Sequence, residues 1–238
     1  MRLLLRSSFL KCDNSFGLFM SEMIIDGNAA ARITLMLAHG AGAPMDHPFM
    51  NTIAEGVAGK NVRVVRFEFP YMAARRSGGR NRAPDREPEL MQTWRDTIAK
   101  LAAPGSIVIG GKSMGGRIAS MVADEVGAAG LICLGYPFHP LGAPTRLRTA
   151  HLEKLQTPAL ILQGTRDSFG LPEEVAKYKL SLKIRIVWIE DGDHSFKPRA
   201  RSCRTYEQNM AEAVAQIKAF LASLKIPAAR KSDTPSSS

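Results

Sequence analysis

The segment that most constrains the fold of this chain is residues 106–120, where an apolar run, a glycine-rich turn and a helical pattern follow one another directly. Residues 107–109 form a β-branched run that is typical of a buried strand. Residues 111–115 then match the pattern G-x-S-x-G, which places a serine on a sharp turn between a strand and a helix. The sequence therefore predicts that Ser113 is a nucleophile held in a strained turn.

The glycines of this turn have a steric role, because side chains at positions 111 and 115 would collide with the adjoining strand and helix. A phosphate-binding loop, G-x-x-x-x-G-K-[ST], also ends in Gly-Lys-Ser, but it requires glycine where this chain has Ser106. An apolar run also fills the intervening positions. Spacing and context therefore exclude the phosphate-loop interpretation.

A serine nucleophile needs a general base, and the base needs an orienting acid. In a strand–turn–helix site of this kind, the acid and then the histidine follow the serine along the chain, each after a later strand. Asp167 follows an apolar segment at 158–163, and His194 follows another at 184–189. The sequence predicts Asp167 as the acid and His194 as the base.

Alternatives exist for both residues. The histidines of the chain are His39, His47, His139, His151 and His194. Only His194 lies beyond the candidate acid. Asp191 and Asp193 are competing acids, but as close neighbours of His194 they cannot easily reach its ring, and we expect them to form turns through bonds to nearby amides.

An oxyanion hole is expected where the strand at 33–38 leads into a glycine-rich loop. One backbone amide should come from Met114, the residue after the nucleophile, and a second from this early loop. We predict Ala41 as the second donor, with Gly42 as the alternative. His39 precedes the serine in the chain, and we expect it to pack the loop rather than act as a base.

Five segments together resemble one family. They are AHGAGAPMDHPFM (38–50), GGKSMGGRIAS (110–120), LGYPFHPLGAP (134–144), QGTRDSFG (163–170) and DGDHSFKP (191–198). The chain resembles α/β-hydrolases, specifically the small lidless group that includes testis-expressed and bacterial "alpha/beta family hydrolase" proteins. The resemblance implies a Ser113–Asp167–His194 triad and hydrolase activity. Dienelactone hydrolases are similar in size but have cysteine at the nucleophile position, where this chain has Ser113, so the resemblance does not extend to their substrate.

The rest of the chain alternates between strand-like and helix-like segments. Strands are predicted at 33–38, 62–68, 106–110, 130–135, 158–163 and 184–189. Helices are predicted at 46–59, 88–102, 115–127, 171–181 and 203–223. Near-continuous apolar strands alternating with helices indicate an α/β fold with a mostly parallel central sheet, covered by helices on both faces. The connection at 138–152 is too short to form a separate lid domain.

One domain is expected over residues 23–224. Residues 1–22 are predicted to be an extension outside it, either a misplaced start, with Met20 and Met23 as alternatives, or a targeting segment. Residues 225–238 are rich in proline, serine and charge, and we expect a disordered tail. Three scattered cysteines give neither a disulfide framework nor a metal-ligand spacing, which favours a reducing cytoplasm. No apolar run reaches membrane-spanning length.

Positive charge is concentrated near the predicted site. The chain has 32 Lys and Arg against 22 Asp and Glu, a formal net charge of +10. Two clusters of basic residues follow the carboxyl ends of predicted strands. In open α/β sheets, the binding or active site lies at that edge. These clusters would attract an anionic substrate, or they form an ordinary solvated surface. The predicted rim residues are Arg75, Arg76, Arg80, Arg82 and Lys197. No nucleic-acid-binding module is recognisable.

These observations predict a serine hydrolase of carboxylic esters or thioesters, acting on a small acyl substrate without a metal or an organic cofactor. A peptidase or amidase would use the same triad and is the first alternative. A non-catalytic binding or scaffold protein on the same fold is the second, although such proteins would be expected to lose triad positions that are all present here.

Overall fold

A computed structural model describes residues 23–79, 82–101 and 107–226 of the chain. The predicted extension at 1–22, nearly all of the predicted tail at 225–238, and Arg80 lie outside the described residues. At its end, the described chain is tied back to the domain, because the Arg32 guanidinium donates to the carbonyl of Ile226 at 3.0 Å.

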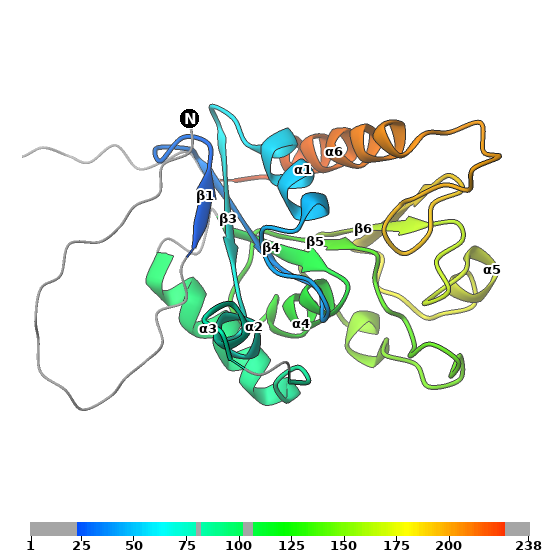
Figure 1. The fold of residues 1–238 in the computed structure, drawn as a ribbon, viewed down its shortest axis with the longest axis horizontal. Helices are drawn as coiled ribbons and strands as arrows, with labels where there is room; N and C mark the ends of the chain where they lie inside the picture. Colours follow the sequence, from blue (N-terminus) through cyan, green and yellow to red (C-terminus); the bar gives the residue numbers. More distant parts are fainter. Residues whose placement is uncertain (1–22, 80–81, 102–106, 227–238) are drawn as a thin grey trace, which may run out of the picture.

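A seven-stranded sheet organises the molecule (Figure 1). Its strands are β1 (Ile24–Asp26), β2 (Ile33–Ala38), β3 (Val62–Phe67), β4 (Ile107–Lys112), β5 (Gly130–Leu134), β6 (Ala159–Gly164) and β7 (Ile184–Ile189). They lie in the order β1-β3-β2-β4-β5-β6-β7. All pairings are parallel except that of β1 with β3. The carboxyl ends of the six parallel strands therefore meet at one edge.

Helices cover both faces of the sheet, as Figure 1 shows. They are α1 (Pro48–Val57), α2 (Pro70–Arg76), α3 (Glu87–Leu101), α4 (Met114–Val122), α5 (Pro172–Val175) and α6 (Tyr206–Ser223), with a 3₁₀ turn η2 (Ala150–Glu153). Side chains of α1 and α6 pack in one apolar cluster with one face of the strands. Those of α2, α3, α4 and η2 pack in a second cluster on the other face. This confirms the predicted fold class.

The predicted strands agree with the observed ones to within about two residues, but some elements were not anticipated. These are the edge strand β1, the short helix α2 and the turn η2. The helix predicted over 171–181 is wrong beyond Val175. There the N–H of Ser181 donates to the Leu152 carbonyl and its hydroxyl donates to the Leu155 carbonyl, so contacts with η2 and with the residues just after it replace helical hydrogen bonds.

Two further features limit what the fold can contain. Between β5 and β6, the described chain forms only loops and η2, so no separate lid domain covers the carboxyl edge of the sheet. None of the helices in the described part of the chain is both long and apolar enough to span a membrane.

Candidate active site

Ser113 lies on the turn between β4 and α4, at the carboxyl edge of the sheet. Its φ of 51° and ψ of −115° place a non-glycine residue in a sparsely populated backbone region. Its N–H donates to the Leu134 carbonyl at 3.0 Å, which fastens the turn to β5. Strained backbone of this kind persists only where the surrounding structure enforces it, and such positions cluster at active sites.

The two glycines of the motif allow β2 to approach the turn. A Cβ atom added to Gly111 would lie 2.2 Å from the Ala38 oxygen, and one added to Gly115 would lie 2.5 Å from the same oxygen. Both clashes therefore involve the end of β2, whereas the sequence suggested a clash shared between strand and helix. This close packing sets the loop that follows β2 beside Ser113.

The structure brings together the three residues predicted to form a triad. His194 Nε2 lies 2.8 Å from Ser113 Oγ, and His194 Nδ1 lies 2.8 Å from Asp167 Oδ2. A carboxylate can only accept, so Nδ1 donates to Asp167 and Nε2 is left to accept the Ser113 proton. The His194 side chain is 26% exposed and that of Asp167 is fully buried, so substrate can reach the histidine but water does not surround the acid.

Neighbouring donors fix the Asp167 carboxylate. The Gln163 side-chain amide donates to Oδ2 at 2.9 Å, and the Phe169 N–H donates to Oδ1 at 3.0 Å. Gln163 is fully buried at the end of β6, and its own oxygen accepts from the Tyr136 N–H. Sequence reasoning missed Gln163, although a polar residue in an otherwise apolar strand, four positions before the acid, was a usable signal.

The competing acids are engaged elsewhere. Asp193 Oδ1 accepts from the N–H groups of Ser195 and Lys197, at 2.8 and 2.9 Å, which is the expected turn-forming role. Asp191 forms an ion pair with Arg199 at 2.7 Å. Neither carboxylate is hydrogen-bonded to the His194 ring in the described structure.

Buried side chains orient the loop after β2. His39 is fully buried, and its Nδ1 donates to the Gly40 carbonyl at 2.7 Å while its Nε2 accepts from the Phe69 N–H at 3.1 Å. Burial lowers the pKa of His39, which favours the neutral ring that these two bonds require. The Tyr71 hydroxyl donates to the Ala41 carbonyl at 2.9 Å. Both nitrogens of His39 are thus occupied in a packing role.

These bonds also set the direction of two amides. In a trans peptide the N–H points away from the carbonyl of the same plane, and no cis peptide occurs among the described residues. Holding the Gly40 carbonyl against His39 therefore turns the Ala41 N–H the opposite way, and holding the Ala41 carbonyl against Tyr71 does the same for the Gly42 N–H. Neither N–H has an acceptor among the described residues.

Met114 is the first residue of α4. The first amides of a helix have no acceptor within it, and the helix dipole adds partial positive charge at that end. Its N–H, with that of Ala41 or Gly42, can stabilise an oxygen that becomes negatively charged next to Ser113.

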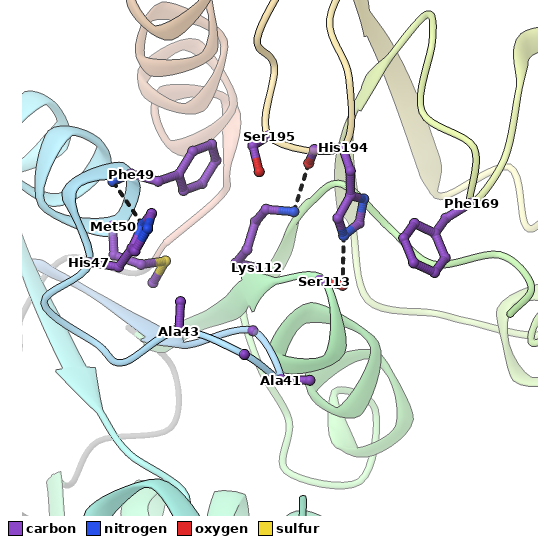
Figure 2. A pocket seen from close by; sticks show the side chains of 12 residues that line it. Ala41, Ala43, His47, Phe49, Met50, Lys112, Ser113, Phe169, His194 and Ser195 are labelled. Carbon is purple, nitrogen blue, oxygen red and sulfur yellow. Dashed lines mark hydrogen bonds between the residues drawn. The ribbon is translucent and has the colours of Figure 1, made fainter. Parts of the chain in front are cut away.

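A cavity of about 340 Å³ opens onto Ser113. Figure 2 shows Phe49 and Met50 of α1 at one side, His194 and Phe169 at the other, and Lys112 between them. The Phe169 and His194 ring centroids are 4.5 Å apart. The lining residues are Gly40, Ala41, Gly42, Ala43, His47, Phe49, Met50, Lys112, Ser113, Phe169, His194 and Ser195. The walls are therefore mostly apolar, with a few polar groups near Ser113.

None of the described rim residues predicted from the charge pattern lines this cavity. Arg76 forms ion pairs with Glu68 at 2.7 Å and with Asp46 at 2.8 Å. Arg82 pairs with Asp85 at 3.1 Å. Arg75 and Lys197 are exposed. The expected basic rim is thus partly neutralised, since one acid just after β3 and another in the loop before α1 compensate Arg76.

Sequence reasoning also missed three pocket residues that lie within the quoted motifs but were not singled out as site residues. Phe49 and Met50 come from α1, and no local pattern distinguishes them from ordinary core residues of an amphipathic helix. Lys112 occupies the first of the two variable positions in the G-x-S-x-G pattern itself. A lysine at the end of a strand that is otherwise fully buried was a signal that could have been noticed.

Comparisons with known proteins agree with this fold. Residues 31–222 match the family described as alpha/beta hydrolase domain. Similar solved structures include a monoacylglycerol lipase from Paleococcus ferrophilus, with 14% identity, a TM-score of 0.63, and coverage of 85% of this chain and 100% of that chain. An alpha-beta serine hydrolase homologue from Coxiella burnetii has 18% identity, a TM-score of 0.61, and coverage of 89% and 99%.

A serine hydrolase without a lid from Xanthomonas campestris has 17% identity, a TM-score of 0.59, and coverage of 87% of this chain and 90% of that chain. At these identities the likeness to solved structures shows the fold alone. The family match spans most of the chain and includes the strand–turn–helix that contains Ser113. This protein belongs to the alpha/beta hydrolase domain family.

Proposed function

We propose that this protein is a serine hydrolase that cleaves small carboxylic esters or thioesters. The observation that carries the proposal is the continuous hydrogen-bond chain from Ser113 Oγ through the His194 ring to Asp167, in which both contacts are 2.8 Å. A serine hydroxyl becomes an effective nucleophile when a positioned base accepts its proton during attack.

In the proposed reaction, Ser113 Oγ attacks the acyl carbonyl as its proton moves to His194 Nε2. Asp167 stabilises the resulting imidazolium and holds its orientation. The carbonyl oxygen, now negative, accepts hydrogen bonds from the N–H of Met114 and of Ala41, or alternatively Gly42. His194 then returns the proton to the leaving group. Water repeats the sequence to release the acid and to regenerate Ser113.

The cavity supports a small substrate. Its volume of about 340 Å³ lies near the lower end of the range for small-molecule sites. Apolar walls from Phe49, Met50 and Phe169 suit the carbon skeleton of an acyl group. The esterases and lipases among proteins of similar fold are consistent with this substrate class.

The decisive experiment is labelling with a fluorophosphonate probe, followed by identification of the labelled residue. We expect covalent labelling of Ser113 in the parent protein and none in Ser113→Ala, whose thermal melt should remain close to that of the parent. Ser106, in the same segment, is the matched control, because its replacement should leave labelling intact. Labelling at a different serine, or none in the parent, would contradict the proposal and favour a binding or scaffold role.

A matched ester and amide then distinguish an esterase from the first alternative, a peptidase or amidase. A p-nitrophenyl ester and the p-nitroanilide of the same short acid differ only in the leaving group. We expect turnover of the ester. Comparable turnover of the anilide would assign the site to amide hydrolysis.

A further inference from the structure

Lys112 places a buried ammonium group at the catalytic site. It is the last residue of β4, directly before Ser113, and its side chain is 9% exposed. Its Nζ donates to the main-chain carbonyl of His194 at 2.7 Å and lies 5.6 Å from the centre of the Phe49 ring. Phe49, Lys112 and His194 all line the cavity, and Figure 2 shows the Lys112 side chain between the other two.

The charge of Lys112 is not matched by a contacting acid. Among the lysines and arginines in the part of the chain that the structure describes, two are buried, Arg66 and Lys112. Arg66 forms an ion pair with Asp26 at 2.7 Å. Lys112 has no carboxylate within ion-pair distance among the described residues. Asp167 and Asp193 attract it only from farther away.

Burial has a larger effect on the pKa of Lys112 than the attraction of Asp167 and Asp193. Burial lowers this pKa to about 8, although the two carboxylate charges act in the opposite direction. Other titratable groups around it are His194, which contacts it through the main chain, and His47, at the start of α1 on the facing wall. The ammonium is therefore under-compensated, and a negative charge delivered into the cavity would stabilise it.

Hydrogen bonding leads to the same conclusion. A lysine ammonium has three N–H donors and accepts none. One donates to the His194 carbonyl, and no second acceptor for Nζ is present in the described structure. Buried donors without partners are costly, which favours a ligand oxygen at this position.

We propose that Lys112 binds a carboxylate at the far end of the acyl group, so that the site selects hemiesters of short dicarboxylic acids. This inference rests on the proposed esterase function. The acyl chain is short because Ser113 Oγ and Lys112 Nζ contact the same residue, one at the His194 ring and the other at its carbonyl. A few carbons span that separation.

The test compares two esters of nearly equal shape, monoethyl succinate and ethyl 4-methylpentanoate. The readout is the ratio of kcat/KM for the anionic ester to that for the neutral ester, so that a general loss of activity cancels. We expect Lys112→Met to lower this ratio about tenfold or more, since a hydrogen bond between charged groups is lost. Lys112→Arg should retain part of the preference.

Lys183→Met is the matched control. This exposed lysine precedes β7 at the opposite edge of the sheet, so its removal changes the net charge equally without altering the cavity. An unchanged ratio in Lys112→Met, or an equal fall in Lys183→Met, would overturn the proposal.

The pH dependence of the unaltered enzyme gives a second measurement that needs no variant. The ratio of kcat/KM values should fall as the pH rises through about 8, because Lys112 loses its charge there, while His194 affects both esters alike. A ratio constant from pH 6 to about 9.5 would also overturn the proposal. Failure of fluorophosphonate labelling would instead refute the esterase function itself, so the two results are distinguishable.

Discussion

The two sides of the cavity are built in different ways. On the acid–base side, Asp167 and His194 follow β6 and β7, and their positions are fixed mainly by groups close to them in the chain. Gln163 and the Phe169 amide, both within four residues of Asp167, hold its carboxylate. Asp193 shapes the turn that contains His194.

On the opposite side, the loop at 39–44 depends on residues about thirty positions away. The Phe69 N–H and the Tyr71 hydroxyl fix the carbonyls and the histidine of this loop. Glu68, only 2% exposed, accepts from the Met45 N–H at 3.2 Å and is in turn paired with Arg76. The acid–base side is therefore held mostly by local contacts, whereas the opposite side depends on α2 and on the residues between β3 and α2.

The largest expected effect tests the acid–base side. Asp167→Asn should lower kcat by roughly 10⁴, because the amide favours the wrong histidine tautomer. Asp193→Asn is the matched control, since it changes a carboxylate next to His194 that does not contact the ring. Steady-state hydrolysis of a neutral short-chain ester measures both variants. Greater damage from the Asp193 substitution would reverse the assignment of the acid.

An intermediate effect on kcat is expected on the side of the cavity formed by the loop at 39–44. Tyr71→Phe removes the hydroxyl that donates to the Ala41 carbonyl but keeps the ring. Losing a whole oxyanion donor costs about 10²–10³ in kcat, and a loosened donor should cost less, about tenfold. Tyr178→Phe is a suitable control because that ring packs on Phe138, away from the loop. Equal activities in the two variants would show that the loop does not need this support.

The smallest effect is expected at the basic surface. Replacing Arg75 and Arg82 with Glu should change kcat/KM for anionic and neutral esters alike by less than about twofold at ordinary salt, because exposed charges are screened within about 8–10 Å. Both residues lie outside the residues that line the cavity. A salt-dependent fall in kcat/KM for the anionic ester alone would show that these arginines attract anionic substrates.

The contrast between the two sides also explains what the sequence could predict. Ser113, Asp167 and His194 each follow a recognisable strand. Because the carboxyl ends of parallel strands meet at one edge of the sheet, the proximity of the three residues could be predicted. Ala41 and Gly42 could be placed in a loop, and His39 could be expected to pack that loop, but nothing local indicates that Tyr71 would orient its peptides. The ion pairs of Arg76 could not be predicted for the same reason, since Glu68 and Asp46 come from separate segments that only folding brings together.

The backbone of Ser113 has a consequence for the stability of the whole domain. A residue with φ of 51° outside glycine costs on the order of 1–3 kcal/mol, and this cost is present whether or not substrate is bound. Against a typical unfolding free energy of about 5–15 kcal/mol, that is a substantial fraction. Glycine at this position would relieve the strain and remove the hydroxyl together. The domain is therefore less stable than its packing allows, and part of the deficit lies at the residue whose hydroxyl the proposed reaction requires.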